Sequence, residues 1–316
     1  MGRYRQRRPV CYQLTCHRRE TSVLYGLLPQ TIRPMDEVHY VVVVSLVAGL
    51  LVRIAFWWGN RWKKRARYAY MIVGQRGETP EERSWGYCNA LLAGEAKALK
   101  FYMCASLEKF EDVKPLTPSP FDTGIGYSVP FIFYDYYLPM RIRNFGTERQ
   151  QELSWTINRF KEGKADASGY FLTCIAKLGL SGPLTILFMP CSSRRNYFVR
   201  FKALAVQLDR YRELEPELYS MRYISERKSK HKSADRNQVS AVSNIVLDAN
   251  VVGKQNCILV DDVCTTGSSI RAHIAELHTF GVRVVGVVCL GKTPLIPSNE
   301  TIMNQARKEY KENFEI

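Results

Sequence analysis

Two adjacent carboxylates and a run of hydroxyl residues stand close together in the second half of the sequence. Asp261 and Asp262 directly follow the apolar run 257–260, and small polar residues lead from them into an amphipathic segment. An uninterrupted apolar run is typical of a buried parallel strand, and the segment after it is typical of a helix. The pattern predicts a strand that delivers two acids to its carboxyl end, where open α/β sheets bind their ligands.

The residues between the acids and the helix suit a phosphate group. Short side chains let backbone N–H groups approach an anion, hydroxyls add donors, and the start of the helix adds positive charge. The candidate phosphate-binding residues are Thr265, Thr266, Gly267, Ser268 and Ser269. The two acids would repel a phosphate but accept hydrogen bonds from a vicinal diol. A phosphate beside a ribose diol is a 5-phosphoribosyl group, so we expect a ligand of this class.

The order of strand, Asp-Asp-Val-x-Thr-Thr-Gly-x-Ser and helix resembles the phosphoribosyl pyrophosphate (PRPP) signature of type I phosphoribosyltransferases. The resemblance implies that Asp261 and Asp262 bind the ribose hydroxyls and that residues 265–269 bind the 5′-phosphate. It also implies Mg²⁺, bound through PRPP and not by metal ligands of the protein. The candidate catalytic residues are Asp261, Asp262 and Thr265. A plain β-turn that caps a helix stays open as the alternative.

A second polar loop follows the apolar run 184–189. It contains Ser192, Ser193, Arg194 and Arg195. In type I phosphoribosyltransferases the strand before the PRPP motif delivers a loop that binds pyrophosphate, and arginine donors match phosphate oxygens in bidentate fashion. We therefore assign these four residues to pyrophosphate. A solvated basic turn is the alternative.

The segment 225–236 is polar, basic and without periodicity. This composition suits a flexible loop that closes over a diphosphate and excludes water. Its candidate residues are Lys228, Lys230, His231, Lys232 and Arg236. For each of them, a role as an ordinary solvated side chain stays open.

Residues around the signature indicate a subgroup of the type I phosphoribosyltransferases and the class of acceptor. The INRFKEG element at 157–163, the Pro-x-Ser-x-Arg-Arg strand end and VDDVCTTGSS resemble the ComF-type, amidophosphoribosyltransferase-like group. The chain departs from that group because Val199–Lys202 only loosely echoes its Arg-Gly-Phe-Asn box and no Cys-rich zinc finger precedes it. Thr265 stands where purine-salvage enzymes place an Asp base, so an amine, ammonia or unidentified acceptor is favoured over a purine.

Two functions from different classes remain open at this stage. The first is a Mg²⁺-dependent phosphoribosyltransferase that transfers the 5-phosphoribosyl group and releases pyrophosphate. The second is a catalytically inactive module that senses PRPP or nucleotides, or that is related to competence and DNA uptake.

Composition sets broad limits on the partners and the compartment. The chain has 316 residues and a net charge of +15, which suits a polyanionic ligand, an anionic lipid or nucleic acid without choosing among them. Its nine cysteines form no Cys-x-x-Cys pair, so we expect reduced thiols of a cytosolic domain. We expect a homo-oligomer.

The N-terminal part contains an apolar run that could anchor the chain. We predict a basic flexible arm over 1–35 and a membrane-spanning helix over 36–62, where residues 40–58 are almost wholly apolar and Lys and Arg follow. Arg53 argues against a span, although it lies within snorkelling reach of the end. A buried β-rich segment, or an upstream stretch outside the working protein, is the alternative. The catalytic part would face the cytosol.

These observations predict an α/β fold of the type I phosphoribosyltransferase class, with a central, mostly parallel sheet flanked by helices. We predict a helical region with a Pro/Gly-rich linker over 63–130 and the phosphoribosyltransferase domain over 131–316. The predicted helices cover 78–110, 148–161, 198–211, 268–280 and 300–316, and the predicted strands cover 131–139, 184–189, 257–260 and 282–290.

Overall fold

The computed structural model describes residues 37–225 and 245–314. The chain divides into two compact units, residues 1–59 and 60–316. The predicted arm over 1–35 lies outside the described residues, as do the predicted loop residues Lys228, Lys230, His231, Lys232 and Arg236.

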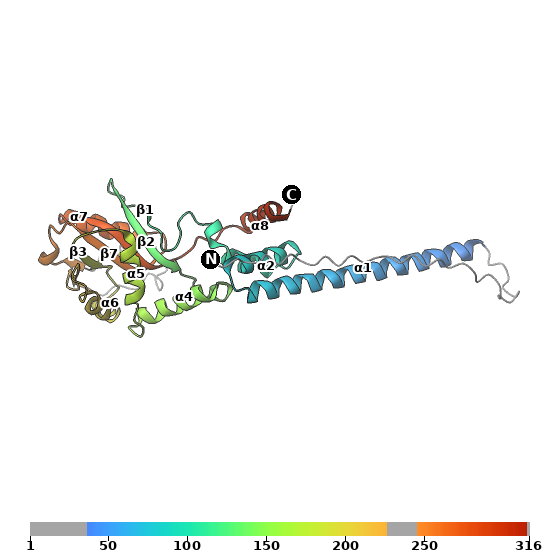
Figure 1. The fold of residues 1–316 in the computed structure, drawn as a ribbon, viewed down its shortest axis with the longest axis horizontal. Helices are drawn as coiled ribbons and strands as arrows, with labels where there is room; N and C mark the ends of the chain where they lie inside the picture. The colour runs from blue at the N-terminus through green and yellow to red at the C-terminus, as the bar shows by residue number, and fades with distance from the viewer. Residues whose placement is uncertain (1–36, 226–244, 315–316) are drawn as a thin grey trace, which may run out of the picture. The chain divides into compact units, whose positions relative to one another are not determined.

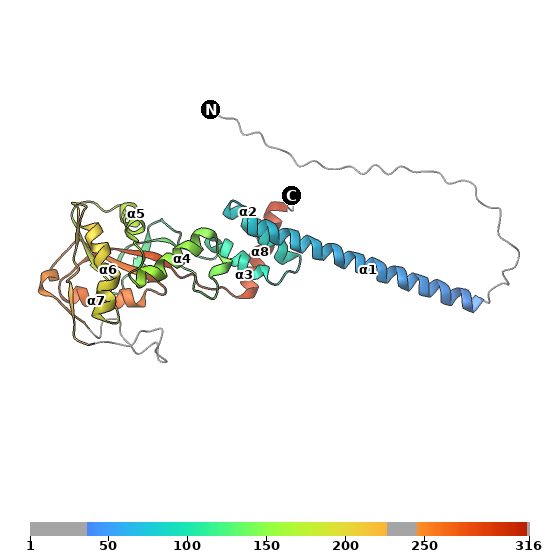
Figure 2. The same ribbon diagram turned by 90° about the horizontal axis from the view of Figure 1, so that it is seen from below.

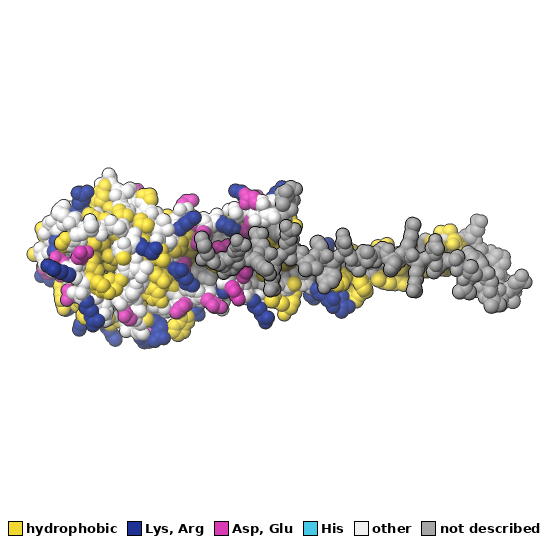
Figure 3. All heavy atoms as spheres, in the orientation of Figure 1, with side chains coloured by type: hydrophobic (Ala, Val, Ile, Leu, Met, Phe, Trp, Pro, Cys, Tyr) yellow, Lys and Arg dark blue, Asp and Glu magenta, His cyan; other side chains and the backbone are white. Residues whose placement is uncertain are grey.

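The described part of the first unit is helical. Helix α1 (Glu37–Arg76) begins in this unit, and every residue from 39 to 60 is exposed. Figure 3 shows hydrophobic side chains on the surface of this helix. The β-rich alternative for residues 40–58 is therefore wrong, and the helix continues past the predicted end at residue 62. By length and composition, α1 qualifies as a helix that crosses a membrane.

The second unit is built on a six-stranded sheet with the order β1-β2-β8-β7-β3-β4. Strand β1 pairs with β2 in antiparallel register, and the other neighbouring strands are parallel. The carboxyl ends of β2, β8, β7 and β3 therefore share one edge of the sheet. The strands are β1 (Ser119–Asp122), β2 (Ser128–Tyr136), β3 (Leu184–Phe188), β4 (Leu214–Pro216), β7 (Cys257–Cys264) and β8 (Val284–Lys292).

Helices cover both faces of this sheet (Figures 1 and 2). The connections β2 to β3 and β3 to β4 run in one direction along the sheet, whereas β7 to β8 runs in the other. Right-handed crossovers of opposite direction place their helices on opposite faces. One face therefore carries α4 (Glu148–Lys161), α5 (Ser168–Leu178) and α6 (Arg194–Leu208), and the other carries α7 (Ser268–Thr279). The predicted α/β fold class is confirmed.

Three further helices, from the beginning and the end of the second unit's sequence, pack together. They are α2 (Pro80–Leu92), α3 (Ala98–Ala105) and α8 (Asn299–Phe314). The prediction of one helix over 78–110 is wrong, because the chain turns at Gly94, which adopts φ +90°. Part of the predicted Pro/Gly-rich linker is also ordered, since it contains strand β1 and the turn into β2.

A two-stranded antiparallel sheet, β5 (Met221–Tyr223) and β6 (Ile245–Leu247), completes the described strands. The described 3₁₀-helices are η1 (Leu107–Lys109), η2 (Arg143–Phe145) and η4 (Ala249–Val251). The seven described cysteines are free and buried, as the sequence predicts for reduced thiols.

Candidate functional site

The two aspartates lie within strand β7, three and two residues before its end. Successive side chains of a strand point to opposite faces, so Asp261 and Asp262 do not face the same way. Asp262 is 5% exposed, whereas Asp261 is only partly buried. The contacts of Asp262 show that it points to the face that carries α4 and α6. Asp261 therefore lies on the face of α7, the helix that follows the hydroxyl-rich turn.

The Asp262 carboxylate is held between two cations. Nζ of Lys161, the last residue of α4, lies 3.5 Å from its Oδ1, and Nη1 of Arg200 in α6 makes an ion pair with its Oδ2. The side chains of Asp262, Arg200 and Lys161 are 7%, 19% and 27% exposed. A carboxylate this buried needs such partners, because desolvation of an unpaired charge costs several kcal/mol.

The Asp261 carboxyl has a raised pKa. Burial, followed by repulsion from Asp262, raises the pKa of Asp261 to about 7, although Arg200 and Lys161 act in the opposite direction. One of its oxygens accepts a hydrogen bond of 2.8 Å from the backbone N–H of Asp262. Its other oxygen makes no hydrogen bond to the described residues, so Asp261 has an acceptor available for a ligand hydroxyl.

The predicted phosphate-binding turn connects β7 to α7. Thr265, Thr266 and Ser268 are exposed, and Ser269 is partly buried. Among the described residues, the backbone N–H groups of Thr265, Thr266 and Gly267 find no acceptor. The turn therefore presents amide donors and hydroxyls beside the amino end of a helix, which is the arrangement that binds phosphate.

Gly267 is required at this turn for two reasons. It adopts φ +75°, which L-residues with a Cβ rarely adopt. A Cβ there would also lie 2.7 Å from the ring of Phe121 in β1. The hairpin β1–β2 thus packs directly under the turn.

Arg271 of α7 supports the same turn from its other side. Its Nη2 donates a hydrogen bond of 2.8 Å to the backbone oxygen of Thr266, and its guanidinium lies 5.6 Å from the Phe121 ring centroid. A cation at this position adds to the positive potential of the turn.

The four residues assigned to pyrophosphate lie at the start of helix α6, where Ser192 and Ser193 precede the helix and Arg194 and Arg195 are its first residues. Arg194 and Arg195 lie in its first turn and not in a loop, because the Ser193 hydroxyl caps the helix by accepting from the N–H of Asn196 at 3.2 Å. Ser192 Oγ accepts from the Asn196 side chain at 3.0 Å. Both arginines are exposed, and the Arg194 guanidinium stacks over Phe198 at 5.5 Å. The strand order places this helix start at the same sheet edge as the Asp261 site.

The end of β8 adds two groups at this edge. Lys292 Nζ lies 2.6 Å from Oε2 of Glu111, in an ion pair whose side chains are 14% and 5% exposed. Thr293 Oγ1 is buried and has no hydrogen-bond partner among the described residues. Lys292 is thus occupied by Glu111.

The described residues contain no group of three or more His, Cys, Asp or Glu side chains arranged to hold a metal ion. Mg²⁺ is commonly bound by one or two carboxylates together with substrate phosphates and water. The described residues fit that mode only in the form where a diphosphate and water would supply the oxygen ligands and the protein adds no dedicated metal ligand.

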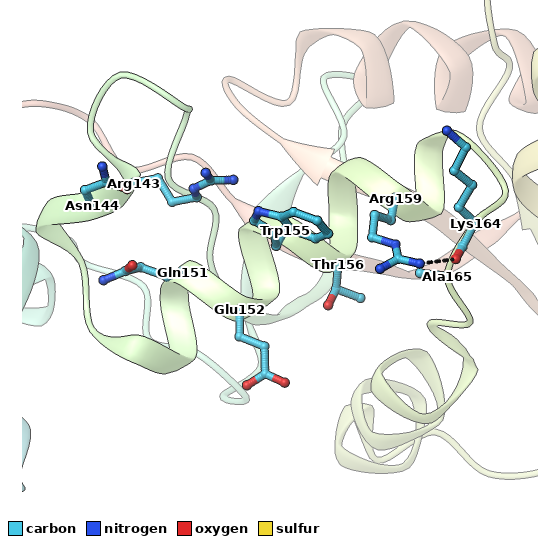
Figure 4. A pocket seen from close by; sticks show the side chains of 9 residues that line it. All are labelled: Arg143, Asn144, Gln151, Glu152, Trp155, Thr156, Arg159, Lys164 and Ala165. Carbon is cyan, nitrogen blue, oxygen red and sulfur yellow. Dashed lines mark hydrogen bonds between the residues drawn. The ribbon is translucent and has the colours of Figure 1, made fainter.

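Two hollows lie away from the turn. The first, of about 580 Å³, lies on the outer surface of α4, where Arg143 extends toward the exposed Trp155 ring and Arg159 stacks on it at 5.5 Å (Figure 4). It includes none of the predicted site residues. The second, of about 1490 Å³, borders the carboxyl end of β2 at Asp135 and Tyr136. Eight carboxylate side chains and four basic side chains line it.

Comparison with known proteins finds one family model that matches part of the chain. The family model described as "Phosphoribosyl transferase domain" matches residues 198–294, which include most of α6, the strands β4 to β8 and the whole turn after β7. The match supports the phosphoribosyltransferase superfamily and phosphoribosyl transfer from PRPP as the general activity. No curated protein matches the chain.

Three residues of the site were not among the predicted ones. They are Lys161, Arg200 and Arg271. Lys161 occurs in the INRFKEG element that carries the ComF resemblance, and Arg200 occurs in the segment Val199–Lys202, where the chain departs from that group. Nothing in their spacing reveals that both reach Asp262. Arg271 lies one helical turn after Gly267, where a basic residue near a phosphate site is a usable signal.

Proposed function

We propose that the protein is a Mg²⁺-dependent phosphoribosyltransferase that binds PRPP at the carboxyl edge of its sheet and transfers the 5-phosphoribosyl group to an amine. The turn after β7 carries the proposal, because its unpaired amides lie beside a partly exposed carboxylate. Asp261 accepts hydrogen bonds from the ribose diol, and residues 265–269 bind the 5′-phosphate.

The reaction is a displacement at C1 of the ribose. The bond from C1 to the pyrophosphate oxygen breaks with its electron pair, a bond from C1 to the acceptor nitrogen forms, and the nitrogen loses a proton. Bound Mg²⁺ would neutralise the charge of the departing pyrophosphate. Arginine and lysine at the start of α6 and around Asp262 supply further positive charge.

An amine is favoured over a purine as the acceptor. Thr265 supplies no carboxylate base for a purine nitrogen. The acid-rich hollow at the end of β2 suits a cationic acceptor, although the whole chain carries a net charge of +15. Asp135 and Gly291 are in register across β2 and β8, and Gly291 is in register with Val263 of β7. Two strand spacings, roughly 10 Å, therefore separate this hollow from the strand that carries Asp261.

The exposed apolar surface of α1 supports a second part of the proposal. We infer that α1 anchors the protein in a membrane, with the phosphoribosyltransferase domain in the cytosol where PRPP is available. Residues 39–60 are exposed, and the basic residues Arg61, Lys63, Lys64 and Arg65 follow them directly.

Purified full-length protein in detergent, incubated with PRPP, Mg²⁺ and a panel of amines, ammonia and nucleobases, tests the activity. We expect pyrophosphate release that requires an amine or ammonia and that Asp261→Asn abolishes. Release with purines alone would contradict the acceptor class. Tight PRPP binding without any release would indicate the sensing module instead.

A further inference from the structure

The two aspartates of β7 differ in their partners, because Asp262 is paired with two cations and Asp261 is not. This difference supports an inference that rests on the proposed function. We infer that Asp261 alone binds the ribose, whereas Asp262 is a positioning residue that holds Lys161 and Arg200 as a pair of cations for the leaving pyrophosphate.

The side chains of Asp261 and Asp262 point in different directions. The two residues are adjacent in a strand, so their carboxylates leave opposite faces of the sheet. Asp262 contacts α4 and α6, and Asp261 lies on the face of α7 with the phosphate-binding turn. A single carboxylate has two oxygens and can accept from both hydroxyls of a vicinal diol. The ribose therefore needs only Asp261.

Asp262 lies in a group of charges that is positive overall. One carboxylate faces a guanidinium and an ammonium, so this group of three carries a net charge of +1. The Nε of Arg200 is buried and makes no hydrogen bond to the described residues. The contact between Arg200 and Asp262 is an ion pair without hydrogen-bond alignment. The buried Nε cannot reach a ligand, so the donors that Arg200 keeps for one are those of Nη2, which the ion pair through Nη1 does not use.

The two cations can be placed relative to a bound PRPP. The 5-phosphate and the C1 substituent lie at opposite ends of the ribose ring. With the phosphate at the turn after β7 and the diol at Asp261, the diphosphate on C1 points away from that turn. Arg200 lies in α6, which begins at the end of β3, the strand that neighbours β7 on the side away from β8. Lys161 and Arg200 are therefore on the same side of β7 as the predicted pyrophosphate residues at the start of α6.

Asp262 then has a definite role. Without a ligand it partly neutralises the two cations and keeps them from being buried unpaired. With Mg²⁺-pyrophosphate beside them, Lys161 and Arg200 share their charge between Asp262 and the leaving group, which favours departure of the pyrophosphate. Arg194 and Arg195, which are exposed in the first turn of α6, are an outer part of the same positive surface.

Separate binding measurements on the full-length protein test this division. Ribose 5-phosphate probes the sugar and turn, Mg²⁺-pyrophosphate probes the cations, and PRPP probes both. Calorimetric titration is made on the wild type and on four variants: Asp261→Asn, Asp262→Asn, Lys161→Met and Lys164→Met. Lys164 is the matched control, because it lies three residues after Lys161, is exposed, and among the described residues makes an ion pair with Glu162 alone, at 2.9 Å.

We expect Asp261→Asn to weaken ribose 5-phosphate binding by about tenfold or more and to leave pyrophosphate binding within about twofold. Asp262→Asn should leave ribose 5-phosphate binding within about twofold and tighten pyrophosphate binding several-fold, since a competing charge is removed while the side-chain oxygen is kept. Lys161→Met should weaken pyrophosphate binding by about fivefold or more, and Lys164→Met should not.

Two results would overturn the inference while leaving the proposed function intact. One is that Asp262→Asn weakens ribose 5-phosphate binding as much as Asp261→Asn does. The other is that Lys161→Met and Lys164→Met affect pyrophosphate equally. A wild-type protein that binds neither PRPP nor ribose 5-phosphate would instead remove both the proposed function and the inference. Unfolding midpoints of all variants identify any loss that comes from misfolding.

Discussion

Nη2 of Arg271 donates a hydrogen bond of 2.8 Å to the backbone carbonyl oxygen of Thr266. The acceptor lies at the middle of the phosphate-binding turn, and the donor lies in the first turn of the helix that follows. This bond fixes the peptide plane between Thr266 and Gly267, and it keeps that plane's N–H group on the opposite side from Arg271. Arg271 thus orients an amide donor and also supplies a positive charge.

Arg271→Met is therefore expected to weaken ribose 5-phosphate binding by about tenfold, because it removes one charge and frees the turn to reorient. Calorimetric titration of ribose 5-phosphate measures the change. Arg212→Met, at an exposed arginine after the end of α6, is the control for the loss of one charge. Equal effects of the two substitutions would show that Arg271 acts only through net charge.

Gly267→Ala is expected to lower the free energy of unfolding by more than about 2 kcal/mol, since strain from the positive φ adds to overlap with Phe121. Chemical denaturation measures it. Gly126→Ala is the matched control, because Gly126 adopts φ +88° but a Cβ there meets nothing within 4 Å. A Gly126→Ala loss as large as that of Gly267→Ala would mean that backbone strain alone sets the requirement for glycine.

The raised pKa of Asp261, about 7, predicts a pH dependence of both stability and binding. The unfolded carboxyl has a pKa of about 4, so between about pH 4 and 7 the folded, unliganded protein binds the extra proton. Its stability therefore falls as pH rises through this window. A ribose diol donates hydrogen bonds to the ionised carboxylate, so ligand binding releases the proton and tightens as pH rises to about 7.

Titration of ribose 5-phosphate at a series of pH values measures this dependence. The phosphate of the ligand itself ionises near pH 6 and contributes its own increase in affinity with pH. Asp261→Asn keeps that contribution and removes the one from the protein. The same pH profile in the variant and in the wild type would show that Asp261 does not titrate on binding.

Much of this organisation could be predicted from local sequence, and the exceptions are non-local contacts. Helix α4 spans residues 148–161 as predicted, because Thr147 and Gln150 form a capping box directly before its apolar stripe. The apolar run before Asp261 also predicts β7, although the strand continues to Cys264. The sequence does not reveal the pairing of β1 with β2, since prolines and glycines at 115–126 signal turns and the pairing partner lies beyond them.

Part of the candidate site is likewise contiguous in sequence, and part is made by contacts between distant residues. The turn 265–269 is one contiguous stretch, so its chemistry can be predicted from residue types. The group formed by Asp262, Lys161 and Arg200 joins three elements that are far apart in the chain, and only the fold brings them together. The sequence predicts the start of α6 at residue 198, later than Arg194, because the first turn is polar and the apolar periodicity begins at Tyr197 and Phe198.

The ion pair of Glu111 and Lys292 should be a stability element and not part of the chemistry. Lys292→Met leaves a carboxylate that is 5% exposed without its cation, so the free energy of unfolding should fall by about 3–5 kcal/mol. Glu111→Gln together with Lys292→Met should recover most of this loss, because no buried charge then remains. Chemical denaturation of both variants measures it. A double variant no more stable than Lys292→Met would contradict this account, and ribose 5-phosphate binding should be unchanged in both.

The proposed membrane anchor depends on the exposed apolar surface of α1. Leu46 and Leu50 lie near the middle of the exposed apolar part of α1, at 68% and 59% exposure. Replacement of both by Arg places two charges where a membrane-crossing helix costs about 2.5–3.5 kcal/mol for each. We expect the full-length wild type to remain with membranes after alkaline carbonate extraction and the double variant to be released. Arg substitutions at Tyr68 and Val73, beyond the basic flank, are the control and should leave the protein with the membrane. Wild-type protein that is extracted by carbonate, or that is soluble without detergent, would rule out the anchor.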